Sequence, residues 1–310
     1  TTLIPEGRRR NAPRFFSLLG ASGSGKSSLI NAGVIPQIRE QYPDCLILQT
    51  RPGDDAFEGL VTPLAAALYP GKEHFTKRLE RELVLKQQLS EISGHLPTLL
   101  KGLLDTLQAD KDTPSYQHIF LFIDQFEELF THTDDKKVGD IPASKYQRIH
   151  QVLAQLIALI DANVSCTLVL IMRADFLSSA LAHPDFGQRI NKQPHELLSP
   201  MSETELRTAI VRPAERQHVK VESGLTENLL NDVEHQPGSL PLLQYALSLL
   251  WDEREARQDR IITLEDYKAF NGLEGALEQR ANRLYQKLSD EQQALCQRIF
   301  LRLVQPGEGA

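Results

Sequence analysis

Residues 20–28 read Gly20-Ala21-Ser22-Gly23-Ser24-Gly25-Lys26-Ser27-Ser28 and match the P-loop pattern G-x-x-x-x-G-K-[ST]. Glycines at these positions allow backbone conformations that a Cβ atom would obstruct, so successive amide N–H groups can turn inward around an anion. A helix that opens at Ser27 adds the partial positive charge of its N-terminus. The apolar run at 15–19 predicts a strand before the loop, and this gives the strand–loop–helix order that the pattern requires. The stretch therefore predicts a phosphate-binding loop.

The pattern also assigns roles to individual residues. We expect Lys26 to reach the β- and γ-phosphates of a nucleotide and the Ser27 hydroxyl to hold Mg²⁺. The residues expected to contact the phosphate chain are Gly20, Ser22, Gly23, Ser24, Gly25, Lys26, Ser27 and Ser28. The alternative is a glycine-rich surface turn that matches the pattern by chance. The apolar segments on both sides of the loop favour the phosphate site.

The composition is that of an ordinary globular protein, because 41% of the 310 residues are hydrophobic and 24% are charged. A formal net charge of −7 argues against nonspecific nucleic-acid binding as the main task, since that task needs a dense basic face. The 3 cysteines lie far apart without metal-ligand spacing, as is typical of a reducing cytosol. No apolar run approaches the ~18 residues of a membrane span, and no signal peptide is visible. We expect a cytoplasmic protein without membrane contact, and, since the chain begins at Thr1, a fragment of a longer protein.

Short apolar runs alternate with helical stretches after the P-loop. Strands are predicted at 45–48, 119–123 and 168–172, with a weaker one at 196–198, and helices at 55–69, 75–108 and 145–160. This alternation predicts a parallel α/β sheet flanked by helices. Ligands bind at the carboxyl ends of the strands in such sheets. We therefore expect Gly20, Arg51, Asp124 and Arg173 to converge on one edge.

The strand pattern fades near Pro200, and an all-helical domain is predicted beyond it. A capping box at Ser202 begins a helix that we expect Pro213 to end. Further helices are predicted at 225–235, 240–254, 263–270 and 274–288. Four parts follow from this pattern: a linker at 1–14, a P-loop NTPase core at 15–200, a helical domain at 201–288, and the start of a truncated domain at 289–310.

Acidic residues close the predicted central strand at 119–123. We expect Asp124 to hold Mg²⁺ together with Ser27, although a carboxylate there could instead cap the next helix. Glu127 and Glu128 follow three and four residues later and face the Asp124 side if a helical turn begins there. One of them is expected to polarise the attacking water as a general base. We favour Glu128, with Glu127 as the alternative; for either one, an acid favoured by the helix dipole is an equally good interpretation.

Arg173 closes the fourth apolar run, and its guanidinium is suited to sensing a γ-phosphate. It could instead form a structural ion pair with Asp175 or Glu127. Arg51 has a similar placement with weaker support.

Together these motifs resemble the STAND class of P-loop ATPases, relatives of NB-ARC and NACHT proteins, and within it the bacterial novel STAND NTPase group. The resemblance covers nearly the whole chain and rests on the P-loop with its flanks at 15–19 and 31–36 and on 51–55, 124–130, 173–176, 238–244, 249–251 and 272–277.

This resemblance implies an additional-strand, AAA+-like core, then a helical domain, then a winged-helix domain that would begin at 289–310. It implies ATP or ADP with Mg²⁺ as cofactors, Pro241 against the adenine, Asp124 as metal ligand and Arg173 as sensor. It also implies a switch that self-associates in the ATP state, with an effector domain upstream and a repeat-built sensor domain downstream. Many relatives serve in bacterial defence or cell death. The short segment before the first strand departs from the family, in which a longer segment helps to cover the adenine.

Four functions are compatible with these residues. The leading hypothesis is a nucleotide-operated switch with slow ATP hydrolysis. The others are a scaffold that holds ADP without turnover, an AAA+-type ATPase acting on nucleic acid, and a metabolic kinase. The acidic charge balance argues against the nucleic-acid motor, and the adjacent acids at 127 and 128 fit a kinase poorly.

Overall fold

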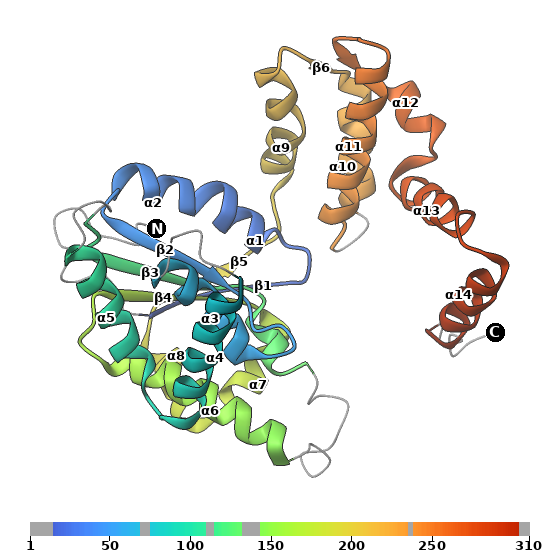
Figure 1. Ribbon diagram of the computed structural model, residues 1–310. Coiled ribbons are helices and arrows are strands. Elements are labelled where there is room, and N and C mark those ends of the chain that lie inside the picture. Colours follow the sequence, from blue (N-terminus) through green and yellow to red (C-terminus); the bar gives the residue numbers. More distant parts are fainter. Residues whose placement is uncertain (1–14, 69–74, 110–114, 132–142, 235–237, 304–310) are drawn as a thin grey trace. The chain divides into compact units, whose positions relative to one another are not determined.

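The strand that leads into the P-loop lies inside a five-stranded parallel sheet in this computed structural model (Figure 1). The strands are β1 (Phe15–Gly20), β2 (Cys45–Thr50), β3 (His118–Ile123), β4 (Cys166–Arg173) and β5 (His195–Leu198). Their order is β2-β3-β4-β1-β5, and each neighbouring pair is parallel. Because β4 separates β1 from β3, the sheet contains the additional strand that was expected. The predicted parallel α/β fold is confirmed.

The structure describes residues 15–68, 75–109, 115–131, 143–234 and 238–303. The predicted linker at 1–14 lies outside this part of the chain. Two units, Thr1–Ser199 and Pro200–Ala310, divide the chain and are described separately. Among the described helices, none combines the length and apolarity that crossing a membrane requires.

The sheet of the first unit is buried on both faces. Phe15 and Leu19 of β1 join one apolar core, and Phe16 and Leu18 join another on the opposite face. Helices α3 (Ala56–Leu68), α4 (Phe75–Glu91), α5 (Leu96–Ala109), α6 (Ala143–Asp161) and α8 (Pro184–Lys192) contribute to the first core. The helical run after the P-loop covers the second core. Burial on both faces explains why β1, β3 and β4 are continuous apolar runs in the sequence.

The helical run after the P-loop consists of α1 (Lys26–Ser28), the π-helical η2 (Leu29–Val34) and α2 (Ile35–Gln41). The wider π turn ends where the N–H of Ile35 bonds the carbonyl of Ile30, immediately before Pro36. Proline lacks an N–H and stands here in the first turn of α2, where a donor is least needed. Gln49 Nε2 of β2 donates to Asn31 Oδ1 at 2.6 Å and ties this run to the sheet.

The single helix predicted at 75–108 is wrong, because the structure breaks it into α4 and α5. Gly94 has a φ of +72° at the break, a conformation that glycine adopts readily. The side chain of Gln155 from α6, which is 1% exposed, satisfies the helix ends there. It accepts from Leu96 N at 2.9 Å and donates to Leu89 O and Ile92 O, each at 2.7 Å.

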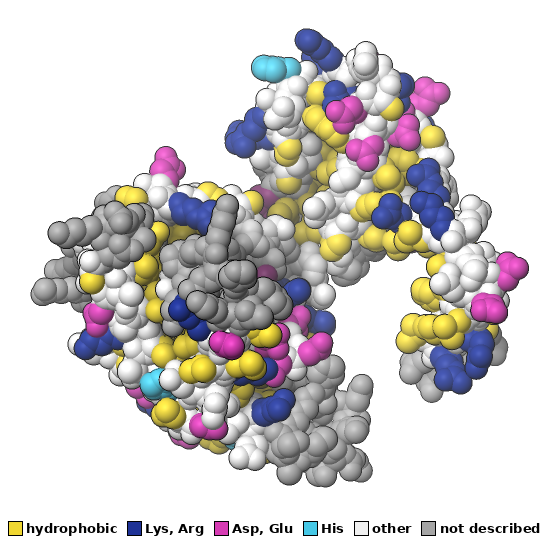
Figure 2. All heavy atoms as spheres, viewed as in Figure 1, with side chains coloured by type: hydrophobic (Ala, Val, Ile, Leu, Met, Phe, Trp, Pro, Cys, Tyr) yellow, Lys and Arg dark blue, Asp and Glu magenta, His cyan; other side chains and the backbone are white. Residues whose placement is uncertain are grey.

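The second unit is mainly helical. Its helices are α9 (Glu203–Arg216), α10 (Ser223–Glu234), α11 (Leu240–Ala256), α12 (Leu264–Ala269), α13 (Gly272–Tyr285) and α14 (Asp290–Leu303). The capping box at Ser202 is present, since the Ser202 hydroxyl accepts from Glu205 N–H and the Glu205 carboxylate accepts from Ser202 N–H. In α14, five large apolar side chains are exposed: Leu295, Ile299, Phe300, Leu301 and Leu303. Figure 2 shows hydrophobic side chains at the surface of this helix.

Two expectations for this unit are wrong. Helix α9 continues through Pro213 to Arg216, because Leu206, Ile210 and Ala214 are buried along one side of it and packing outweighs the cost of the proline. The unit is also not entirely helical, since β6 (Lys220–Val221) pairs in parallel with β7 (Ile261–Ile262). The assignment of 289–310 to a winged-helix domain stays a prediction.

We expect Gly59→Ala to destabilise the first unit by about 1–3 kcal/mol, because an added Cβ would lie 2.2 Å from the carbonyl oxygen of Arg51. The matched control is Gly102→Ala in α5, where a Cβ meets nothing within 4 Å. That change should stabilise by up to ~1 kcal/mol, since alanine is the better helix former. Urea unfolding of both variants provides the measurement. Equal effects of the two changes would contradict the close packing at Gly59.

Candidate functional site

The glycines of the P-loop are required by its backbone. Gly23 and Gly25 have φ angles of +69° and +86°, which side chains disfavour. Gly20, opposite Arg173 in the β1–β4 register, is packed closely, since an added Cβ would lie 2.9 Å from Ser24 Oγ and 3.2 Å from Leu198 O. All three glycines of the motif thus have a physical reason visible in the structure.

Lys26 stands at the centre of the loop and is only 9% exposed. Its ammonium donates to Gly20 O at 3.0 Å and to Ala21 O at 2.7 Å. Burial lowers the pKa of Lys26 below its ordinary value. The carboxylates of Glu127 and Asp124 oppose this shift in pKa, while the Arg173 guanidinium adds to it. The charges at the ends of β3 and β4 therefore act on the lysine.

A phosphate chain with Mg²⁺ fits the residues around Lys26. The Ser24 hydroxyl is buried and has no hydrogen-bond partner among the described residues. The first N–H groups of the helix that starts at Lys26 have no acceptor within the helix. Ser27 lies in the first turn of that helix, and Asp124 leaves one carboxylate oxygen unbonded among the described residues. Hydroxyl and carboxylate oxygens are the ligands that Mg²⁺ prefers.

The chain turns sharply at the end of β3. Asp124 N bonds Thr50 O at 2.8 Å, and Asp124 Oδ1 accepts from Gln125 N at 2.9 Å. Gln125 then adopts a φ of +52°, an uncommon conformation for a residue other than glycine. The 3₁₀-helix η3 (Phe126–Leu129) follows. Asp124 therefore bonds the turn backbone, and its remaining oxygen is available for a ligand.

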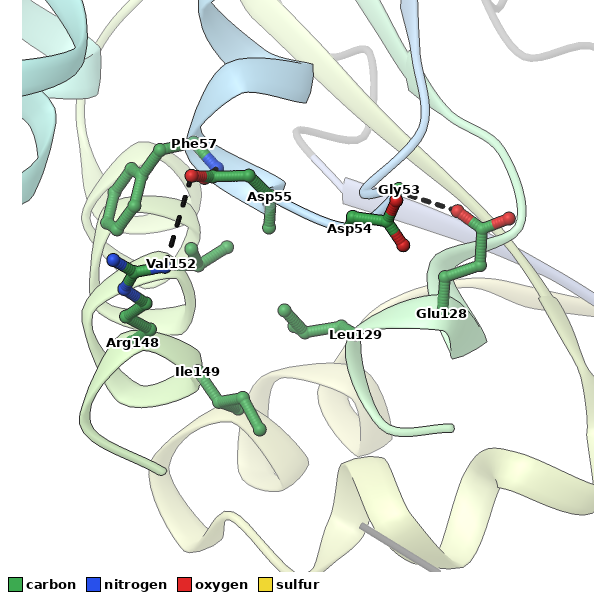
Figure 3. Close-up of a pocket in the computed structure, with 10 residues that line it drawn as sticks. Gly53, Asp54, Asp55, Phe57, Glu128, Leu129, Arg148, Ile149 and Val152 are labelled. Atoms are coloured by element: carbon green, nitrogen blue, oxygen red, sulfur yellow. Dashed lines mark hydrogen bonds and ion pairs between the residues drawn. The ribbon is translucent and has the colours of Figure 1, made fainter. Parts of the chain in front are cut away.

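The two glutamates of η3 point to different surroundings. Glu127 is 9% exposed, accepts from the backbone N–H of Arg173 at 3.2 Å, and acts electrostatically on Lys26. Glu128 accepts from the backbone N–H of Gly53 at 2.8 Å, in the loop after β2 (Figure 3). A 3₁₀ turn and the left-handed Gln125 set this divergence. Glu127 therefore acts on the P-loop lysine and Glu128 on the loop after β2, and which of them serves as the general base stays a prediction.

Arg173 ends β4 beside Gly20, but its side chain is engaged. Its guanidinium forms a two-point pair with Asp175, with Nε–Oδ1 at 3.1 Å and a second bond at 2.5 Å, and lies 5.1 Å from the Phe176 ring centre. This pairing raises the pKa of Arg173 and lowers that of Asp175. The ion pair with Asp175 considered from the sequence is thus present. A sensor role requires the guanidinium to leave this pair.

Within the first unit, Arg51 is not brought to the P-loop, and the predicted contact of Pro241 with adenine stays a prediction. Arg51 follows β2, which β3 and β4 separate from β1, and its side chain is exposed. Pro241 lies in the first turn of α11 in the second unit. The remaining residues belong to the loop and to the ends of β4, which pairs with β1, and of β3, the next strand along the sheet: Gly20 to Ser28, Asp124, Glu127 and Arg173.

Two features of the site were not predicted from the sequence. The bond from Gly53 N–H to Glu128 joins residues 75 positions apart, and spacing alone carries no sign of it. The one hint of this bond in the sequence was the expectation that Arg51 and Asp124 lie at the same edge of the sheet. The left-handed conformation of Gln125 had no signal, because glutamine has no preference for it.

A model of the family described as Novel STAND NTPase 1 matches residues 2–310. No curated protein matches the chain. Among solved structures, the Aeropyrum pernix ORC2 protein in ADPNP and ADP complexes aligns over 89% of this chain and 65% of its own, at 16% identity and a TM-score of 0.52. The Aeropyrum pernix ORC1 protein in complex with DNA aligns over 90% of this chain and 63% of its own, at 12% identity and a TM-score of 0.50.

At such identities the likeness to solved structures shows the fold alone, and it confirms the predicted AAA+-like form of the P-loop NTPase fold. The chain spans less than two thirds of the length of either protein.

We expect Lys26→Met to weaken the binding of inorganic tripolyphosphate by roughly 10- to 100-fold, since a charge-assisted hydrogen bond contributes about 1.5–3 kcal/mol. The control is Lys101→Met on the exposed side of α5, which should bind as the unchanged protein does. Isothermal titration calorimetry measures both. Equal affinities of the two variants would rule out Lys26 as the phosphate ligand.

Proposed function

The chain belongs to the Novel STAND NTPase 1 family, and on this premise we propose that it is a signal-transducing switch that binds ATP, hydrolyses it slowly and couples nucleotide state to self-association. One observation supports the proposal most strongly: the buried Lys26 ammonium lies in the P-loop under the electrostatic influence of Glu127 and Asp124, which follow β3. The loop supplies the site for phosphate, and the carboxylates supply the groups for hydrolysis.

In this proposal the P-loop residues hold the phosphates of ATP or ADP. Lys26 is already held by two loop carbonyls, so its donors are oriented before a nucleotide arrives. The unpartnered Ser24 hydroxyl is available as a further phosphate contact. Ser27 and Asp124 would hold Mg²⁺, which neutralises phosphate charge when it is bound.

We assign the general base to Glu127. One of its oxygens accepts from the Arg173 N–H at the end of β4, and its charge acts on Lys26. The other oxygen is free to orient and deprotonate a water that attacks the γ-phosphate. Glu128 holds the Gly53 loop and so acts as a positioning residue.

Two contacts favour slow turnover. Arg173 is paired with Asp175, so this pair must break before the guanidinium can stabilise negative charge on the γ-phosphate. One of the two oxygens of the Glu127 carboxylate also accepts a hydrogen bond from the backbone N–H of Arg173. Both features suit a site that holds a nucleotide for long periods. They equally favour the second candidate, a scaffold that retains ADP with negligible turnover.

A signalling role, plausibly in bacterial defence or cell death, is proposed from membership of the family alone. The exposed apolar residues of α14 support an assembly function, because large exposed apolar patches commonly mark interaction sites. We propose self-association in the ATP state, an effector domain upstream, a sensor domain downstream and a cytoplasmic location. An ATPase that acts on nucleic acid is disfavoured by the net charge of −7.

We expect Glu127→Gln to lower the ATP hydrolysis rate by roughly 100-fold while nucleotide binding persists, because glutamine keeps the shape of the carboxylate and loses its basicity. Glu128→Gln is the matched comparison and should retain most of the activity, since Gly53 N–H can still bond its amide oxygen. Phosphate release under excess MgATP measures both variants. A large loss in Glu128→Gln with none in Glu127→Gln would reverse the assignment.

A further inference from the structure

A pocket of about 340 Å³ lies beside the bond between Glu128 and Gly53, and both residues line it (Figure 3). Its walls are formed by the loop that follows β2, by the 3₁₀-helix η3 and by helix α6. Phe57, Leu129, Ile149 and Val152 supply an apolar lining, and Asp54 and Glu128 supply carboxylates. Pockets of this size accommodate small organic molecules.

The walls of this pocket are fixed by contacts on several elements. Asp55 caps α3 by accepting from Phe57 N at 3.1 Å, and it pairs with Lys86 at 2.8 Å. Burial alone would raise the pKa of Asp55, but hydrogen bonds from Lys86 and the Glu58 backbone hold it below its ordinary value. Gly59 packs directly on the carbonyl of Arg51 at the start of the same loop. The pocket is thus preformed, which lowers the entropic cost of binding.

The pocket carries unbalanced negative charge on one side. Asp54 is exposed and has no hydrogen-bond or ion-pair partner among the described residues. Glu128 uses only one of its oxygens in the bond to Gly53. Asp55 is already neutralised by Lys86, and Arg148, whose side chain is 68% exposed, lies across the pocket 4.0 Å from Asp55 (Figure 3). A positive group on the ligand would balance Asp54 and Glu128.

We propose that this pocket binds an amphiphilic organic amine, with its ammonium between Asp54 and Glu128 and its carbon chain on Phe57, Leu129 and Val152. A metal ion suits the site less well, because the described residues contain no group of three or more His, Cys, Asp or Glu side chains placed to hold one. The apolar lining adds a hydrophobic contribution that only an organic cation can use.

Binding here has a consequence for the nucleotide site. Glu128 lines the pocket, and its neighbour Glu127 on the same 3₁₀ turn acts on Lys26. A ligand that draws Glu128 away from Gly53 would therefore move the turn that carries the proposed general base. This consequence rests on the proposed function, whereas binding of the amine does not.

Hexylamine is the probe, with hexanol and hexanoate as neutral and anionic analogues, in calorimetric or ligand-observed NMR titrations of the whole chain without nucleotide. We expect hexylamine to bind with a Kd of about 1 mM or tighter, and at least roughly fivefold more tightly than either analogue. Asp54→Asn should remove this preference, while Asp105→Asn, an exposed acid on α5, should leave it intact.

Ala56→Leu tests the location, because Ala56 lines the pocket and a larger side chain there reduces its volume. We expect it to weaken hexylamine binding, with an unchanged circular dichroism spectrum as the check on folding. Equal binding of hexylamine and hexanol, no binding of hexylamine, or binding that neither Asp54→Asn nor Ala56→Leu affects would overturn the proposal. None of these outcomes bears on ATP binding, so a failure here is distinguishable from a failure of the proposed switch.

Discussion

The buried ammonium of Lys26 is the constraint on which the rest of the first unit depends. A charge that is 9% exposed is costly unless hydrogen bonds and opposite charges compensate it. The carbonyls of Gly20 and Ala21 provide the hydrogen bonds, and Glu127 and Asp124 provide the charge. This arrangement is possible because β4 sets β3 one strand away from β1, and because both faces of the sheet are sealed by apolar cores.

The same constraint links structure to the proposed switch. Carboxylates compensate Lys26 in this structure, and the phosphates of a nucleotide would add negative charge on its exposed side. Two charged groups near the site are held by other partners. The Arg173 guanidinium pairs with Asp175, and the Glu128 carboxylate accepts from Gly53 N–H. Each can be released by a local change without unfolding the sheet. A site of this kind is suited to reporting which nucleotide it holds.

Much of this architecture could be predicted because it depends on local patterns. Strands buried on both faces are continuous apolar runs, and the P-loop motif fixes the order of strand, loop and helix. The errors arose where distant residues decide. Gln155 caps the break between α4 and α5 from another helix, and burial of Ala214 carries α9 through Pro213. Spacing also placed Glu127 and Glu128 together, whereas the 3₁₀ turn and the left-handed Gln125, both local features, give them different surroundings.

The central claim, that nucleotide bound at Lys26 controls assembly, is tested most directly by the particle mass in solution. Mass photometry or light scattering would compare the chain with MgADP, with MgATP and with MgATP after Lys26→Ala. The account predicts a larger assembly only for the unchanged protein with MgATP, which reverts as ATP is consumed. A mass that stays the same in all three samples, while calorimetry shows that ATP is bound, would contradict it.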